Sequence, residues 1–120
     1  MLRLPKTILV AMDPVDLHLS FDRLAAVVRN ELGAEPKADT VVVFHNRRRT
    51  HVKLLWHDGS GYLLVYKRLD RGTYRIPLAV PAGARRVTAS SQELMVLLDG
   101  LDEARLRRAH ALARRGDKNQ

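Results

Sequence analysis

The sequence has no cysteine, which excludes disulfide bonds and makes the cytoplasm the expected compartment. It also lacks any run near the ~20 apolar residues that span a bilayer, so no membrane segment is expected. There is no glycine-rich phosphate loop, no nucleophile elbow and no cysteine nucleophile. The sequence therefore lacks the common motifs of nucleotide hydrolysis and of covalent catalysis. No cofactor is expected.

The chain does have a moderate apolar content and a strong positive charge. Its 120 residues are 46% apolar and 28% charged, which is ordinary for one folded domain. The formal net charge of +8 favours a polyanionic partner. Nucleic acid is the first class to consider, and an anionic membrane surface is the second.

Most of the positive charge lies in the middle of the sequence. Between Val41 and Leu78 there are eight basic residues against two acidic ones, which is +6 of the total +8. Charge that only keeps a protein in solution is spread along the chain, so this concentration indicates a segment that meets a polyanionic partner or surface. The candidate contact residues are Arg47, Arg48, Arg49, Lys53, Lys67, Arg68, Arg71 and Arg75.

The pattern of apolar residues predicts an α+β fold. We expect an antiparallel β-meander sheet packed against an N-terminal helix, with one or two short C-terminal helices. One domain is expected over residues 1–101, followed by a basic C-terminal helix and a frayed tail over residues 102–120. The expected strands are a short buried strand at 7–12, a meander at 40–45, 51–57, 62–69 and 73–76, and a last strand at 85–89.

Two helices carry recognisable end signals. The first should follow Ser20, a favourable N-cap residue, and end at Gly33. The second should follow Ser90, which can form a capping box with Glu93, and end at Gly100. The apolar stripe of the first helix comprises Phe21, Leu24, Ala25, Val28 and Leu32.

The turn at Asp58–Gly61 predicts the register of a β-hairpin. A symmetric closure pairs His57 with Tyr62, and the pairing continues as 55 with 64, 53 with 66 and 51 with 68. Side chains alternate between faces, so Trp56 falls on a nearly pure apolar face that is expected to be core. The other face is basic and aromatic, and comprises His51, Lys53, Leu55, His57, Tyr62, Leu64, Tyr66 and Arg68.

This basic and aromatic face has two interpretations. It suits phosphate contacts beside packing against bases or sugars. It is equally compatible with a solvated sheet face, or with a face whose leucines are covered by the C-terminal helix. The tip at Arg47–Arg49 is a stronger candidate, because three adjacent guanidinium groups repel one another without an anion nearby. Its alternative is a solvated loop tip.

A metal site is not expected. His45 and His51 flank the arginine tip and could approach each other, but two histidines without a cysteine or carboxylate make a poor zinc site. The neighbouring arginines would also repel a cation. Asp16 and Asp22 fit roles at the start of a helix better than roles as catalytic carboxylates.

A series of short motifs follows one another along most of the chain. They are Pro14-x-Asp16, Ser20-Phe21-Asp22-x-Leu24-Ala25, Leu32-Gly33, Val43-Phe44-x-Asn46-Arg47-Arg48-Arg49, Lys53-Leu54-Leu55-Trp56-x-Asp58-Gly59-x-Gly61, Lys67-Arg68-Leu69-x-x-Gly72, Pro77 and Leu94-x-x-Leu97-Leu98-Asp99-Gly100. In their order and spacing these motifs resemble the accessory protein encoded by the second open reading frame of IS66-family bacterial insertion sequences, often labelled TnpB. The resemblance extends over roughly residues 5–102.

The resemblance implies a non-catalytic accessory role in transposition, beside a separate transposase that carries out the chemistry. The expected partners are DNA, either transposon ends or non-specific duplex, and the transposase subunit. The alternative is an interaction module in which Trp56, Leu55, Leu64 or the Leu94–Leu98 helix docks onto the transposase without DNA contact. A metal-dependent nuclease is a third possibility, which the lack of clustered metal-binding carboxylates disfavours.

Overall fold

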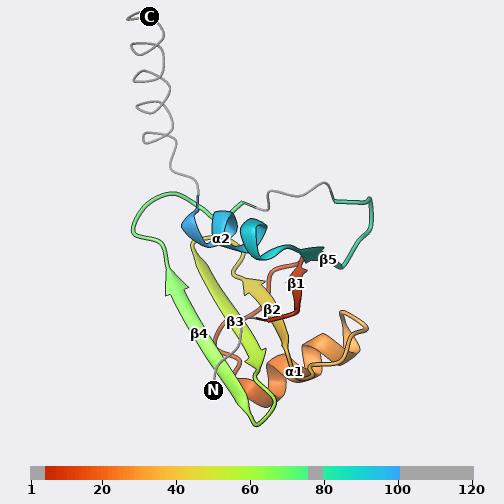
Figure 1. Cartoon of the computed structure of the whole chain (residues 1–120). Helices are drawn as coiled ribbons and strands as arrows, with labels where there is room; N and C mark the ends of the chain where they lie inside the picture. Colours follow the sequence, from red (N-terminus) through yellow and green to blue (C-terminus); the bar gives the residue numbers. More distant parts are fainter. Residues whose placement is uncertain (1–4, 76–79, 101–120) are drawn as a thin grey trace, which may run out of the picture.

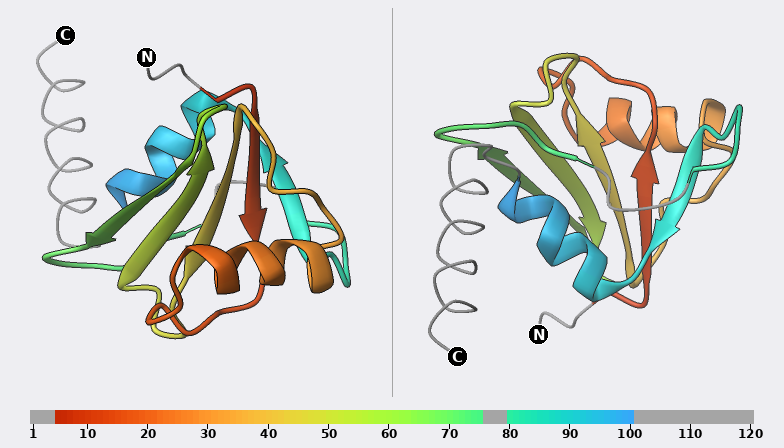
Figure 2. Two further views of the ribbon diagram at one scale, coloured as in Figure 1. Left: turned by 90° about the horizontal axis from the view of Figure 1, so that it is seen from below. Right: turned by 90° about the horizontal axis from the view of Figure 1, so that it is seen from above.

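The fold is a five-stranded sheet with one helix on each face, as seen in a computed structural model that describes residues 5–75 and 80–100 (Figures 1 and 2). The strand order is β4-β3-β2-β1-β5. The elements are β1 (Thr7–Ala11), α1 (Phe21–Asn30), β2 (Thr40–His45), β3 (His51–His57), β4 (Tyr62–Arg68), β5 (Arg86–Ala89) and α2 (Ser91–Asp99).

The sheet is mixed, which corrects the expectation of a purely antiparallel meander behind an N-terminal helix. β1 precedes the helix and pairs in parallel with β2, with Thr7 opposite Thr40. α1 is the crossover that joins these two parallel strands. The meander itself is confirmed for β2, β3 and β4, which pair antiparallel in sequence order. The α+β class is likewise confirmed.

Parallel pairing explains why β1 and β2 are almost entirely apolar. Every residue of β2 is buried, as are Ile8–Ala11 of β1. A central strand with both faces covered reads as a continuous apolar run, without the alternation of a strand that is half exposed. The sequence therefore indicates that 7–12 is a buried strand, but it carries no local signal for the strand beside it.

α1 packs on one face of the sheet through its predicted apolar stripe. Leu24 and Val28 are fully buried against Phe44 and Leu55. Ser20 occupies the predicted N-cap position, although its side chain makes no capping hydrogen bond. Gly33 adopts the expected positive φ, at 63°, just beyond the helix. α1 covers the leucines of the basic and aromatic sheet face, Leu55 and Leu64.

α2 packs on the opposite face and closes the second half of the core. Leu97 is buried there with Ile8, Val43 and Val52. Trp56 lies on this face, opposite to Tyr66 as predicted, but it is half-buried instead of fully enclosed. The predicted capping box is present, with the Glu93 N–H donating to Ser90 Oγ at 3.0 Å and the Ser90 N–H donating to Glu93 Oε1 at 2.9 Å.

The β3–β4 hairpin has the predicted register, with His57 opposite Tyr62 and His51 opposite Arg68. The Asp58 carboxylate stabilises its turn by accepting hydrogen bonds from the Ser60 and Gly61 N–H groups at 2.9 and 3.0 Å, and from the Ser60 hydroxyl.

β5 is confirmed one residue shorter than expected. The chain from Thr73 to Arg75 forms no strand of the sheet, and the expected structure at 76 and at 102–120 lies outside the described residues.

Replacing Leu24 with Ala should lower the free energy of unfolding by about 2–4 kcal/mol, because a cavity adds to the lost transfer energy of a fully buried side chain. Urea denaturation measures this directly. Met95→Ala is the control, since Met95 is 66% exposed on α2 and should change stability by less than ~0.5 kcal/mol. A similar small effect at Leu24 would contradict the packing of α1 on the sheet.

The Asp58 turn should make stability depend on pH. Hydrogen bonds from Ser60 and Gly61 hold the pKa of the Asp58 carboxyl below its ordinary value of 3.8. Its contribution is therefore complete above pH 3.8 and is lost as the pH falls through the lower folded-state pKa. Melting temperatures of the wild type and Asp58→Asn should differ most near neutral pH and converge in acid. A pH-independent difference would refute this.

Candidate nucleic-acid interface

The three clustered arginines lie on a tight connection between β2 and β3, here called the arginine turn (Asn46–Thr50). The Asn46 side chain organises it. Asn46 Oδ1 accepts hydrogen bonds from the N–H groups of Thr50 at 2.9 Å and His51 at 3.0 Å. Its Nδ2 donates to Thr50 Oγ1 at 3.0 Å. The Asn46 side chain thus pairs with two main-chain N–H groups and one hydroxyl, and these hydrogen bonds hold the turn in one conformation.

Two histidines that flank the arginine turn also hold it in place. Nδ1 of His51 lies 2.8 Å from Thr50 Oγ1 and 3.2 Å from Asn46 Nδ2. The ring nitrogens of the buried His45 lie within hydrogen-bond distance of the carbonyl oxygens of Asn46 and Met12, at 2.9 and 3.1 Å. His45 thereby connects the end of β2 to the end of β1. The two rings serve the turn, and they do not converge on a shared ligand position.

All three arginines of the turn are exposed, and the segment after β4 adds further positive charge beside them. The Leu69 N–H donates to the Thr50 carbonyl at 3.0 Å, and the Tyr74 N–H donates to the Arg49 carbonyl at 2.7 Å. These bonds fasten the loop between residues 69 and 74 against the arginine turn. Arg68, Arg71 and Arg75 are therefore brought to the same end of the sheet.

Two more arginines reach this end through β5. Arg86 is the register partner of Ala11 at the end of β1, and the Met12 N–H donates to the Arg85 carbonyl at 3.0 Å. Neither arginine was predicted from the sequence, because both lie far along the chain from the central charge cluster. We name the combined surface the basic rim, and it comprises Arg47, Arg48, Arg49, Arg68, Arg71, Arg75, Arg85 and Arg86.

The two predicted lysines are engaged with main-chain carbonyls. Lys53 is half-buried, and its Nζ donates to the carbonyls of Leu17 at 2.6 Å and Leu19 at 2.8 Å, which fixes the segment before α1. Lys67 Nζ donates to the Leu98 carbonyl at 2.7 Å, near the end of α2. A cation at a helix C-terminus is favourable. Both ammonium groups thus have structural partners, and their contribution to nucleic-acid binding stays a prediction.

The fold separates charge between the two ends of the sheet. The connections at the end of the sheet that carries the basic rim contain Asp13, Asp16 and Asp70. The end of α2, with Asp99, lies beside Lys67 and Leu69. The connections at the opposite end carry mainly acidic groups, opposed there by Lys6 and Lys37. Those acidic groups are Glu31, Glu35, Asp39 and Asp58. The positive field is therefore strongest where β1 and β2 end, which suits contact with a run of phosphates.

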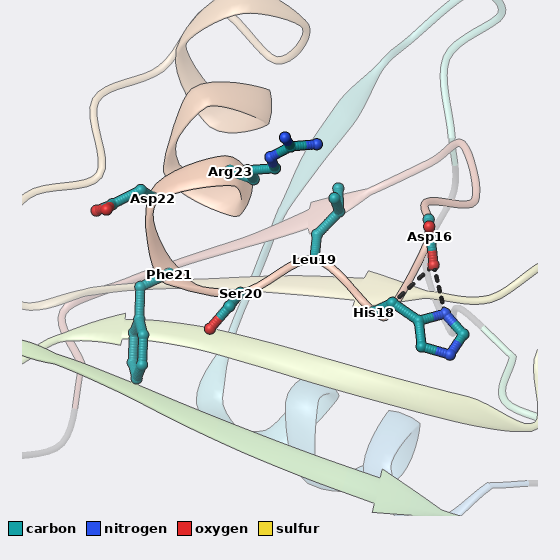
Figure 3. A pocket seen from close by; sticks show the side chains of 7 residues that line it. All are labelled: Asp16, His18, Leu19, Ser20, Phe21, Asp22 and Arg23. Carbon is teal, nitrogen blue, oxygen red and sulfur yellow. Dashed lines mark hydrogen bonds and ion pairs between the residues drawn. The ribbon is translucent and has the colours of Figure 1, made fainter.

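A shallow depression lies at the start of α1 (Figure 3). Asp16 and His18 point toward each other within it, with Asp16 Oδ1 2.9 Å from both the N–H and Nδ1 of His18. These hydrogen bonds hold the pKa of the Asp16 carboxyl below its ordinary value. In residues 5–75 and 80–100, no three His, Cys, Asp or Glu side chains gather in a way that could hold a metal ion.

Comparisons with known proteins agree with the resemblance seen in the sequence. The model of the family described as IS66 Orf2 like protein matches residues 6–108. Two proteins of Sinorhizobium fredii (strain NBRC 101917 / NGR234) are similar over most of their length. "Uncharacterized protein y4jC" is 35% identical over 101 residues, covering 84% of each chain. "Uncharacterized protein y4hO" is 36% identical over 93 residues, covering 78% of each chain.

The chain belongs to the IS66 Orf2-like family. This membership supports an accessory role in insertion-sequence transposition. No solved structure matches the chain. No helix among the described residues is long and apolar enough to cross a membrane.

Asn46→Ala should lower the free energy of unfolding by about 1–3 kcal/mol, because two main-chain N–H groups lose their acceptor in a half-buried turn. Urea denaturation tests the size of this effect. Arg47→Ala, at an exposed position of the same turn, is the control and should stay within ~0.5 kcal/mol of the wild type. Equal stability of the two variants would show that Asn46 does not organise the turn.

Proposed function

We propose that this protein is a non-catalytic accessory factor of insertion-sequence transposition that binds duplex DNA through the basic rim. The observation that carries the proposal is the convergence of eight exposed arginines, from three separate segments, on one end of the sheet. Arginine suits this task because its planar guanidinium donates two hydrogen bonds to a phosphate at once.

Binding by this surface should be driven mainly by phosphates. Neutralising backbone phosphates releases counterions and gives affinity that is independent of base sequence. Sequence preference would need side chains that reach base edges. Selection of element ends is therefore assigned to the transposase or to the assembled complex, and the basic rim supplies general affinity.

A second candidate is an interaction module that contacts the transposase without touching DNA. The outer side of α2 supports it, because Met95 and Val96 are 66% and 56% exposed. Of the other predicted docking residues, Trp56 is half-buried and packs against the core on the α2 face. Leu55 is fully buried and Leu64 packs against the core under α1, so α2 is the better docking surface. This candidate requires association with DNA only when the transposase is present.

Replacing Arg47, Arg48 and Arg49 together with Ala should weaken binding to specific and random duplex DNA alike. The slope of log affinity against log salt should become shallower by roughly 2–3 units, since each lost phosphate contact releases about one counterion fewer. Fluorescence anisotropy with labelled duplexes across a salt series measures both quantities. Thermal stability should change little, because the three side chains are exposed.

A charge-matched control is Lys6→Ala combined with Arg29→Ala and Lys37→Ala, which removes three positive charges at exposed positions outside the basic rim. This control should keep most of the affinity and salt slope of the wild type. If the arginine-turn variant also keeps them, the arginines are a solvated tip, and docking through α2 becomes the preferred function.

A further inference from the structure

Arg49 differs from the other two arginines of the arginine turn in its backbone conformation. Its φ is 58°, in the left-handed region, whereas Arg47 and Arg48 have no positive φ. An L-residue with a Cβ atom is strained there, and glycine or asparagine is the usual occupant. The local backbone would thus favour glycine at this position, so the shape of the turn does not account for an arginine side chain.

The main chain of Arg49 is held on both sides. Its N–H donates to the Asn46 carbonyl at 3.1 Å, and its carbonyl accepts from the Tyr74 N–H at 2.7 Å. The first bond lies within the arginine turn, and the second joins the turn to the segment that carries Arg75. The backbone of Arg49 is therefore already ordered, so that binding a ligand through its side chain costs less conformational entropy.

Arg49 and Arg75 line the same surface pocket, together with Met12, Thr73, Tyr74 and Val80. Among the described residues, the lining carries two guanidinium groups and the hydroxyls of Thr73 and Tyr74, and no carboxylate. The Tyr74 hydroxyl donates to the Lys67 carbonyl at 3.4 Å, which leaves the Thr73 hydroxyl as the neutral donor. Arg49 also lines a small apolar hole beside Val52 and Leu97. A long basic side chain whose aliphatic part packs on an apolar surface places its charged group at the edge of that surface. The pocket thus combines two cations with a neutral donor, which is the chemistry that a phosphate requires.

We infer that Arg49 and Arg75 form a preorganised seat for one phosphate group. This inference rests on the proposed function, because a phosphodiester of the DNA backbone is the ligand in view, and a terminal 5′-phosphate has the same chemistry. The two guanidinium groups bind the phosphate oxygens, and the Thr73 hydroxyl supplies a further hydrogen bond. Arg47 and Arg48 add charge around the seat.

The test compares Arg49→Gly with Arg48→Gly, since each removes one guanidinium and adds one glycine to the same turn. Arg49→Gly should weaken binding of a random-sequence duplex about tenfold, and Arg48→Gly only about twofold. Arg49→Gly should nevertheless melt at or above the wild-type temperature, because glycine relieves the positive φ. Arg48→Gly should melt lower than Arg49→Gly by about 4–8 °C.

A second experiment combines Arg75→Ala with Arg49→Gly in a double-mutant cycle. If both arginines hold one phosphate, adding Arg75→Ala to Arg49→Gly should cost much less affinity than it costs in the wild type, because the seat is already broken. Duplexes with and without a 5′-phosphate distinguish the two sources. Equal losses on both duplexes assign the seat to an internal phosphodiester, and a loss seen only with the phosphorylated duplex assigns it to the terminal group.

Two results would overturn the seat while leaving DNA binding by the basic rim intact. One is an Arg49→Gly variant that binds both duplexes no worse than Arg48→Gly does, while the triple arginine variant is weakened. The other is independent, multiplicative losses for Arg49→Gly and Arg75→Ala. If the triple variant itself binds as tightly as the wild type, the proposed function fails, and this outcome is distinct from both.

Discussion

The parallel pairing of β1 with β2 is the constraint on which the rest of the molecule depends. It places β1 between β2 and β5, so that both central strands are buried on two faces and must be apolar throughout. α1 then has to cross one face, and α2 covers the other (Figure 2). The same pairing makes β1 and β2 end together, which is why the connection after β1, the arginine turn and the start of β5 share one end of the sheet.

That shared end combines rigid hydrogen bonding with concentrated positive charge. Asn46, His45 and Tyr74 tie the arginine turn to its neighbours through main-chain groups, so the guanidinium groups stand on a fixed support. Mutual repulsion among exposed arginines costs free energy when no anion is present, and the hydrogen bonds of the turn offset this cost. The two lysines expected to share this role also have structural partners, since Lys53 donates to carbonyl oxygens before α1 and Lys67 donates to a carbonyl oxygen in the last turn of α2.

Family membership and geometry point in compatible directions. The IS66 Orf2-like family connects the chain with transposition, and the basic rim is the surface proposed to contact DNA. The exposed apolar residues of α2, Met95 and Val96, project from a helix that packs on one face of the sheet, whereas the rim lies along the ends of its strands. The proposed DNA contact and the alternative contact with a protein partner therefore involve different surfaces. An accessory factor that joins a transposase to DNA needs such a separation.

Local patterns in the sequence determined much of this protein. The hairpin register from His57–Tyr62 to His51–Arg68, the α1 stripe at Leu24 and Val28, and the α2 capping box all follow from spacings of a few residues, and all are confirmed. The exposed arginines at 47–49 were equally visible. Tertiary structure alone decided that β1 lies parallel to β2, that Arg85 and Arg86 join the basic rim, and that Lys53 turns to two carbonyls. These features depend on contacts between residues more than 30 positions apart, and such contacts are set by which surfaces bury each other and leave no periodic signal in the chain.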